Sequence, residues 1–437
     1  MIFMEIIAVG GYEEVGRNMT VIRYGDDAIV IDMGIRLDRV LIHEDTDISK
    51  LPPEELASRG IIPSIQDDFG EVKAIVLTHA HLDHLGAVSI LAEKFPMAPI
   101  IGTPYTIEVV KQELRGRRKN PLYVLEAGEV LQVAPKLSIE FVRITHSIPD
   151  TVFLVVHTPE GSLAYFNDFK LDDTPVIGEK PDYQRIRELG KEGLKALIIE
   201  TTRVANDGRT PSEQVARTLL EDTLLKSNPE RGLIVTTFSS HIARIKSILD
   251  IAEKLGREPL LLGRSMEKYV SIAERKGIIS LPKEAHVYGG RDAIKKALKR
   301  AAKDKQRYIL IITGHQGEHD ALLTKIANQK FEFRIEPGDE VVFSADVIPN
   351  PINVAQRYAL ETKLKMQGAR LFKGLHVSGH ASREDHYDLL KMLQPEKIIP
   401  THGTLDMLAI YAELAETLGY AINREVFLLR NGQRMEV

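Results

Sequence analysis

The chain has 437 residues, of which 43% are hydrophobic and 27% are charged. This balance excludes a disordered or fibrous protein and leaves room for two or three folded domains. Cysteine is absent and the net charge is -5, so any metal must be bound by His, Asp or Glu, and the net charge does not by itself indicate a nucleic-acid partner.

The chain begins with a short apolar stretch, residues 1–10, which lacks the basic lead-in and cleavage site of a signal peptide and predicts a first β-strand. No apolar run approaches the roughly 20 residues of a membrane span, so we expect a cytoplasmic protein. Up to about residue 205, apolar and β-branched runs alternate with turn signals and predict strands at 6–9, 19–24, 28–33, 74–78, 138–144, 152–157, 162–167 and 196–199. Helical spacing at 87–95 and 106–116 predicts helices between them, and therefore sheets packed between helices.

The pattern changes after Thr210. Pro211 with Ser212, Glu213 and Gln214 predicts the start of a helix that runs to Leu224. Predicted strands at 233–237, 259–262, 308–313 and 340–344 then alternate with helical segments such as 242–255. Short strands alternating with helices predict a parallel, doubly wound sheet in a second domain, with boundaries near 205 and 365.

Two local stretches are basic despite the negative net charge. The first, Lys111 to Lys119, contains Arg115, Arg117 and Arg118. The second, Arg291 to Arg307, contains Lys295, Lys296, Lys299, Arg300, Lys303 and Lys305. A solvated helix face is the ordinary explanation for each, and they support nucleic-acid binding only if a stronger signal points there.

The strongest signal is a cluster of three histidines and an aspartate directly after the predicted strand at 74–78: His79, His81, Asp83 and His84. His79 and His81 are two residues apart, so in extended backbone they project to the same side and can hold one ion. Asp83 and His84 follow where the chain turns into a helix and can face a second ion. Packing alone is a poor explanation, because buried imidazoles without metal suffer mutual desolvation and charge repulsion.

Four residues do not complete a dinuclear site, so further ligands are expected at other strand ends. His146, Asp168 and His402 each follow a predicted strand, and a carboxylate such as Asp168 can bridge two ions. Each of them alone is more often a capped or hydrogen-bonded loop residue, but together they supply the ligands that the first cluster lacks. Asp32, between a strand and Gly34, is either a carboxylate that orients a ligating histidine or a plain turn residue.

These residues carry a family resemblance. The histidine cluster resembles the signature of the metallo-β-lactamase superfamily, and Asp32, His146 and Asp168 follow its ligand order. Glu200, His380 and His402 are similar to the motifs of its nucleic-acid-processing β-CASP branch. The segments 10–18, 236–240 and 313–318 resemble the ribonuclease J family in particular, in its shorter archaeal form, since bacterial members usually carry a further C-terminal domain.

The resemblance implies an α/β fold: a metallo-β-lactamase αββα sandwich formed by residues 1–205 and 366–437, with a β-CASP domain, a parallel sheet with flanking helices, inserted at 206–365. It implies two Zn2+ per chain, with Mn2+ as the alternative. One ion would be bound by His79, His81 and His146, the other by Asp83, His84 and His402, with Asp168 bridging. The implied catalytic residues are Asp83, Glu200 and His380, with His380 as proton donor and Glu200 orienting its ring.

The resemblance also implies a function in RNA decay and processing. The expected activity is 5′→3′ exonuclease action on single-stranded RNA with a 5′ monophosphate, with endonuclease activity left open. The implied RNA- and phosphate-binding residues are Thr237, Ser239, Ser240, Ser378, Gly379, His380, Ala381 and Ser382. For Ser239 and Ser240, helix capping without a ligand is an equal alternative. A homodimer and contacts with other RNA-decay proteins are also left open.

Four alternative functions stay within reach of the same motifs. A small-molecule hydrolase of the superfamily would explain the ligands but not the inserted domain or His380. An endonuclease of RNA 3′-end processing would share the ligands, but no KH module precedes the catalytic part. A DNA-repair nuclease tends to have an apolar residue where this chain has His402, and a catalytically dead scaffold predicts broken motifs, of which none is found.

Overall fold

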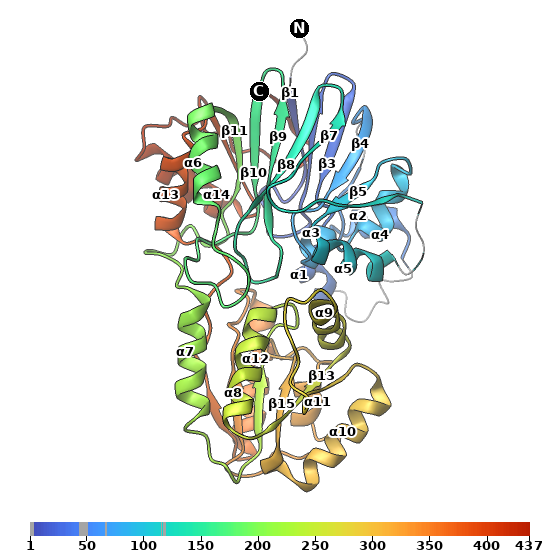
Figure 1. Cartoon of the computed structure of the whole chain (residues 1–437), viewed down its shortest axis with the longest axis vertical. Helices are drawn as coiled ribbons and strands as arrows, with labels where there is room; N and C mark the ends of the chain where they lie inside the picture. The colour runs from blue at the N-terminus through green and yellow to red at the C-terminus, as the bar shows by residue number, and fades with distance from the viewer. Residues whose placement is uncertain (1–3, 43–50, 66–67, 115, 117–118) are drawn as a thin grey trace. The chain divides into compact units, whose positions relative to one another are not determined.

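The computed structural model describes residues 4–42, 51–65, 68–114, 116 and 119–437. Arg115, Arg117 and Arg118 of the first basic stretch and residues 1–3 of the expected first strand lie outside the described residues. The chain divides into two compact units, whose residues can be located in Figure 1 by the colour bar. Unit 1 comprises Met1–Asp173, Glu179–Thr210 and Gly379–Val437, and unit 2 comprises Thr174–Gly178 and Pro211–Ser378.

Unit 1 contains two β-sheets. The seven-stranded sheet has the order β19-β1-β2-β3-β4-β5-β6, with β1 Met4–Gly10, β2 Met19–Tyr24, β3 Asp27–Ile31, β4 Glu71–Val76, β5 Ile100–Gly102, β6 Leu122–Val124 and β19 Arg434–Glu436. The six-stranded sheet has the order β18-β11-β10-β9-β8-β7, with β7 Val130–Ala134, β8 Leu137–Arg143, β9 Val152–Thr158, β10 Gly161–Phe166, β11 Leu194–Glu200 and β18 Lys397–Thr401.

Helices cover the outer faces of these sheets (Figure 1). On the seven-stranded sheet these are α1 Leu37–Ile42, α2 Pro53–Ser58, α3 Leu82–Leu85, α4 Val88–Leu91, the 3-10 turn η2 Ala92–Lys94 and α5 Pro104–Leu114. On the six-stranded sheet they are α6 Tyr183–Glu192, α13 Arg383–Leu393 and α14 Leu405–Glu416. The expected helices at 87–95 and 106–116 correspond to α4 with η2 and to α5.

Two apolar cores hold unit 1 together. Ile29 and Val76 of the first sheet and Phe141 and Tyr165 of the second are buried in the core between the two sheets. A second core packs the outer face of the six-stranded sheet against α6, α13 and α14. Strand β11, which pairs with β18 and β10, is buried almost throughout, as a strand covered on both faces requires. The layers are therefore helix, sheet, sheet, helix, which confirms the expected αββα sandwich.

Unit 2 is a doubly wound α/β domain. Its six strands are all parallel, in the order β14-β13-β15-β12-β16-β17. The strands are β12 Leu233–Thr236, β13 Glu258–Leu262, β14 His286–Tyr288, β15 Tyr308–Ile312, β16 Glu340–Phe343 and β17 Arg370–Phe372. The helices are α7 Glu213–Leu224, α8 Ile242–Lys254, α9 Arg264–Arg275, α10 Arg291–Lys303, η3 Lys305–Arg307, α11 Leu322–Ala327 and α12 Pro351–Met366.

Unit 2 extends beyond the domain boundary expected near residue 365 when it is defined by packing. Residue 365 falls inside α12, which packs on β17, and β17 pairs with β16. The structure therefore keeps residues up to Ser378 in unit 2. At the other boundary, the Ser212 hydroxyl caps α7 by accepting from the Gln214 amide at 3.1 Å, as a helix start at Pro211 predicts.

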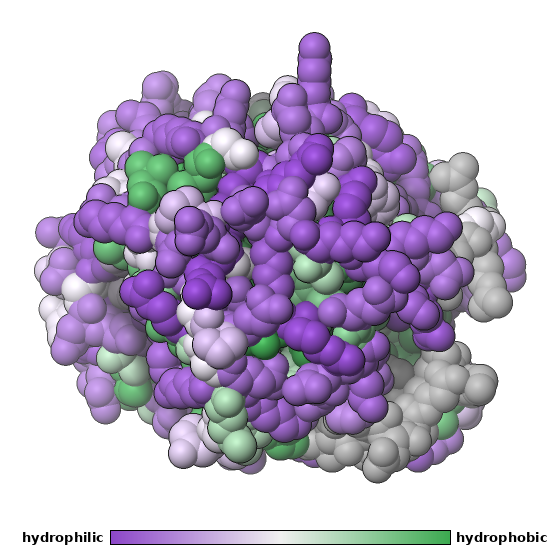
Figure 2. All heavy atoms as spheres, turned by 90° about the horizontal axis from the view of Figure 1, so that it is seen from below, coloured by the Kyte–Doolittle hydropathy of each residue, from purple (hydrophilic) through white to green (hydrophobic). Residues whose placement is uncertain are grey.

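None of the described helices combines the length and apolarity that a membrane span requires. Seen from below, the coloured residues in Figure 2 are mostly hydrophilic, with small separate apolar patches.

Candidate active site

The candidate metal ligands all lie in unit 1, at the ends of strands or the start of a helix. His79 comes shortly after β4, and Asp83 and His84 lie in α3. The loop at Gly34 packs directly on α3: a Cβ at Gly34 would lie 1.6 Å from the carbonyl oxygen of Asp83, so only glycine allows this approach. Asp168 follows β10 and His402 follows β18. Strand ends of both sheets thus bring together residues that are distant in sequence.

Asp168 lies at the centre of the cluster. Its Oδ2 is 3.6 Å from His79 Nε2, 3.4 Å from His84 Nε2 and 3.4 Å from His146 Nε2, and its Oδ1 is 3.3 Å from His402 Nε2. These separations are close to the roughly 3.4 Å edge expected between N and O ligands about 2.1 Å from a shared tetrahedral ion. Oδ2 therefore contacts imidazoles of both ligand groups, His79 and His146 of one and His84 of the other, while Oδ1 faces His402. The carboxylate is shared by the two groups, as a bridging ligand is.

Three sets of side chains in this cluster place their donor atoms within 4.8 Å of one another: His79, His81, His146 and Asp168; Asp83, His84, Asp168 and His402; and Asp168, Glu200 and His380. His81 Nδ1 is 3.0 Å from His146 Nε2. The structure thus brings together all seven side chains that the sequence suggested as ligands.

The residues present fit a divalent metal. His79 Nε2 and Asp168 Oδ1 are buried and have no hydrogen-bond partner among the described residues. A buried polar atom without a partner is costly, and both atoms point into the ligand cluster. Imidazole nitrogens and carboxylate oxygens are the donors that zinc accepts in the absence of thiolates.

A second layer of hydrogen bonds orients the imidazoles. His84 Nδ1 donates to Asp32 Oδ2 at 2.8 Å, and both residues are fully buried. His402 Nδ1 donates to Asn18 Oδ1 at 2.8 Å, and His146 Nδ1 donates to the Gly379 carbonyl oxygen at 2.7 Å. Each bond leaves the Nε2 lone pair directed at the cluster.

Two of these orienting groups were not found from the sequence. Asn18 belongs to the 10–18 motif, which was noted without a role for this residue. The Gly379 carbonyl is a backbone group that residue type does not reveal. Asp32 adopts φ 61° and His402 φ 50°, conformations that are strained for residues other than glycine and that cluster at functional sites.

Burial and charge set the protonation of the ligands. Burial first, and neighbouring His79 second, lower the pKa of His81 to about 3. Burial raises the pKa of Asp168, but His402 and His84 outweigh it and hold that pKa well below the ordinary value. The carboxylate is therefore ionised and His81 is neutral, which are the forms that bind metal. Burial lowers the pKa of His84, yet Asp168, Asp83 and Asp32 raise it well above the ordinary value, so metal binding at this ring releases a proton.

His380 and Glu200 form a pair beside Asp168. His380 Nδ1 donates to Glu200 Oε1 at 3.1 Å, and His380 Nε2 is 3.9 Å from Asp168 Oδ2. Glu200 is fully buried and also accepts from the Thr202 amide at 3.0 Å. Burial lowers the pKa of His380, but Glu200 and Asp168 raise it to about 9. The ring is therefore protonated at neutral pH and presents a proton at Nε2.

The loop of residues 379–382 is held tightly. Gly379 has no room for a side chain, since a Cβ would lie 2.9 Å from the His146 ring. Ala381 is fully buried in the core beside α13. Ser382 caps α13 in a capping box with Asp385, and its hydroxyl contacts Thr210 Oγ1 at 2.9 Å. These contacts give Ala381 and Ser382 structural roles in addition to any contact with RNA.

The remaining residues suggested for phosphate binding belong to unit 2. Thr237 is fully buried and its hydroxyl donates to the Ser344 carbonyl oxygen at 3.2 Å. Ser239 and Ser240 are half-buried between the end of β12 and the start of α8. Ser378, also half-buried, ends the unit. Ser239 and Ser240 are therefore better placed than Thr237 to present hydroxyls to a ligand.

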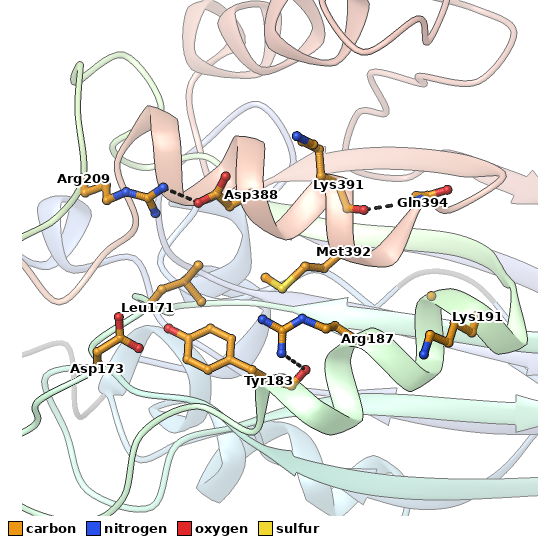
Figure 3. A pocket seen from close by; sticks show the side chains of 11 residues that line it. Leu171, Asp173, Tyr183, Arg187, Lys191, Arg209, Asp388, Lys391, Met392 and Gln394 are labelled. Carbon is orange, nitrogen blue, oxygen red and sulfur yellow. Dashed lines mark hydrogen bonds and ion pairs between the residues drawn. The ribbon is translucent and has the colours of Figure 1, made fainter.

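A cavity of about 900 Å3 lies elsewhere in unit 1, between α6 and α13 (Figure 3). Arg187, Lys191 and Lys391 line it together with apolar and acidic side chains, and Arg209 is paired with Asp388. None of the metal-ligand candidates lines it. The chemistry therefore belongs to the Asp168 cluster and not to this cavity.

Sequence comparisons agree with the site. Residues 12–215 match the family model of the metallo-beta-lactamase superfamily, residues 230–358 that of the ribonuclease J beta-CASP domain, and residues 368–428 that of a Zn-dependent metallo-hydrolase RNA specificity domain. The chain is 56% identical to ribonuclease J of Methanocaldococcus jannaschii over 98% of each chain, and 52% identical to that of Pyrococcus abyssi over 99% of this chain and 97% of the relative. The chain belongs to the ribonuclease J family.

Membership in the ribonuclease J family makes the chain a metal-dependent ribonuclease and decides against the small-molecule hydrolase and the inactive scaffold. Ribonuclease J of a Synechocystis strain is 32% identical over 99% of this chain and 66% of the relative. A crystal structure from Enterococcus faecalis V583, described as a protein of unknown function, matches with a TM-score of 0.68 at 18% identity over the full length of both chains. That last likeness shows the fold alone.

Proposed function

We propose that this ribonuclease is a 5′→3′ exonuclease that prefers RNA with a 5′ monophosphate and binds two Zn2+ ions. The observation that supports the dinuclear site is the position of Asp168, whose carboxylate lies within 3.3–3.4 Å of His146 in one imidazole group and of His84 and His402 in the other. His79, His81 and His146 would hold one ion, and Asp83, His84 and His402 the other, with Asp168 shared. Bound divalent cations supply Lewis acidity to the scissile phosphate and lower the pKa of water for attack.

The protein's own residues can protonate the leaving group. Cleavage of a phosphodiester leaves negative charge on the departing 3′ oxygen, which a proton donor stabilises. His380 holds a proton at Nε2 because Glu200 accepts from Nδ1 at 3.1 Å and favours the charged ring. We assign His380 as the general acid, with Glu200 keeping its ring oriented and protonated.

The 5′ preference is supported by unit 2. Ser239 and Ser240 lie where β12 ends and α8 begins, and the N-terminus of a 13-residue helix attracts phosphate through its free amides and its dipole. A terminal phosphate bound there would make RNA binding depend on the 5′ end, which favours removal of nucleotides from that end.

The test uses one RNA sequence labelled at its 3′ end and carrying either a 5′ monophosphate or a 5′ triphosphate. Progressive shortening of the monophosphate RNA, with the triphosphate RNA resistant, is expected. Discrete internal fragments that are equal for both RNAs would overturn the exonuclease assignment and make the enzyme an endonuclease. The variant pair Ser239→Ala and Ser240→Ala should weaken the preference for the monophosphate, while Ser227→Ala, a serine distant from this loop in sequence, should leave it unchanged.

A further inference from the structure

Helix α10 of unit 2 has one apolar face and one strongly basic face. Ile294, Ala297, Leu298 and Ala301 are buried and pack into the core under the sheet. The exposed face carries six cations: Arg291, Lys295, Lys296, Lys299, Arg300 and Lys303. The helix contains a single carboxylate, Asp292. It therefore carries five net positive charges in a chain whose total is -5, so the rest of the chain is at -10.

The arrangement of these cations is unfavourable for the free protein. Arg291, Lys295, Lys299 and Lys303 follow one another at intervals of four residues, so each lies beside the next on the helix surface. A like-charge pair at this spacing costs about 0.2–0.5 kcal/mol. Other helices of unit 2 place a carboxylate at this spacing, such as Asp250 after Lys246 on α8. A helix face that served solubility alone would carry similar alternation.

The rest of the fold neutralises little of this charge. Lys299 forms an ion pair with Glu332 at 3.1 Å, and the Arg300 guanidinium lies 5.3 Å from the centre of the Tyr308 ring. Among the described residues, no carboxylate lies within ion-pair distance of Lys295, Lys296 or Lys303. The basic face is thus available to an external anion.

The position of α10 connects this face to the functional edge of the sheet. The helix starts directly after β14, and all six strands are parallel, so its N-terminal end lies at the carboxyl edge where β12 and β15 also end. The pKa of Asp320 in the loop after β15 is lowered by Lys325 first and also by Arg291, which places Arg291 close to that loop. From this edge the cations extend about 18 Å along the helix.

We propose that the basic face of α10 (Arg291, Lys295, Lys296, Lys299, Arg300 and Lys303) is a second RNA-binding surface that holds the phosphate backbone of the substrate. This proposal rests on RNA being the substrate and is independent of the end preference proposed above. A regular row of cations without aromatic side chains matches a strand of phosphates and provides no means of reading bases. Protein interfaces instead concentrate apolar and aromatic groups.

If the basic face of α10 contacts RNA, its lysines should contribute to the salt dependence of RNA affinity. Each lost lysine–phosphate contact lowers the slope of log affinity against log salt by about 0.7 for a single strand. The variant K295Q/K296Q/K299Q/K303Q removes four charges, and glutamine preserves helix propensity. If two to four of these lysines contact phosphates, the slope should fall by about 1.4 to 2.8.

Binding of a 40-nucleotide RNA is measured in EDTA, where no cleavage occurs, over a range of salt concentrations. The matched control is K226Q/K283Q/K330Q/K365Q, which removes four exposed charges from other parts of unit 2. The α10 variant should lose slope and at least tenfold in affinity near 0.1 M salt, and should raise KM in cleavage while kcat stays at the wild-type value. The control should match the wild type.

Equal slopes for the wild type, the α10 variant and the control would overturn the proposal and leave the face for an acidic protein partner. An equal loss in both variants would also overturn it, because it would show only a general charge effect. Because binding is measured without cleavage and with either 5′ end, its outcome is separate from that of the exonuclease assay.

Discussion

Asn18 offers a selective way to weaken one half of the metal cluster. Its side-chain oxygen accepts from His402 Nδ1 at 2.8 Å, and its side-chain nitrogen donates to the Asp83 carbonyl oxygen at 3.1 Å. Asn18→Ala removes both bonds, together with the 3.1 Å contact between its side-chain nitrogen and His84 Nε2, and leaves every ligand side chain in the sequence. Loss of such an orienting partner lowers metal affinity about 10–100-fold, which corresponds to about 1.4–2.8 kcal/mol.

The assay titrates metal-free protein with Zn2+ against a fluorescent chelator and resolves two binding steps. In Asn18→Ala, the step that involves Asp83, His84 and His402 should weaken, and the other should keep its affinity. Asn18→Asp retains an acceptor for His402 Nδ1 and should recover most of the loss. If Asn18→Ala binds both ions as tightly as the wild type, or loses both equally, the assignment of Asn18 to one ion is refuted.

Two further predictions concern pH. Burial raises the pKa of Glu140, but hydrogen bonds from His157 and Arg185 lower it to about 2, below the ordinary 4.5. The ionised carboxylate therefore contributes about 3 kcal/mol to the free energy of unfolding above pH 4.5, and this contribution is lost as the pH falls toward 2. Urea unfolding of metal-free protein should show the loss in the wild type and not in Glu140→Gln. Equal dependence of the unfolding free energy on pH in the two proteins would contradict the prediction. Glu200→Gln should lower the pKa of His380, so that the decline of kcat at alkaline pH begins about 1–3 pH units lower, while metal content is unchanged. If the kcat–pH profile of this variant matches that of the wild type, Glu200 does not have the assigned role.

The architecture was predictable where the pattern of apolar and polar residues distinguishes buried strands from helices and turns. Strands such as β4 and β11 are apolar runs ended by polar residues, and the repeated strand–helix alternation of unit 2 predicts its parallel sheet. Strand β19 carries no such signal, because it has three residues and forms only by pairing with β1 from the other end of the chain. The sequence pattern does not show that residues 366–378 pack with unit 2, because the pairing of β17 with β16 appears only in the folded sheet.

The candidate site was predictable where its residues are neighbours in the sequence. His79, His81, Asp83 and His84 are neighbours in sequence, so residue type and spacing are enough to suggest metal binding. The hydrogen bond between Asn18 and His402 joins residues 384 positions apart, and only the folded sheet brings them together. Backbone partners have no residue signature at all, and the capping role of Ser382 depends on a helix that the pattern did not predict.

The most direct test of the dinuclear hydrolytic centre is to measure the number of bound metal ions and the cleavage rate in the same samples. Metal-free protein is supplied with increasing Zn2+, the bound ion is quantified by mass spectrometry, and the cleavage rate of a 5′-monophosphorylated RNA is measured at each step. A site in which Asp168 joins two ions predicts that full activity requires two equivalents, and that Asp168→Ala fails to retain both. Full activity with a single bound equivalent, or an Asp168→Ala variant that binds two ions and cleaves RNA, would contradict the account.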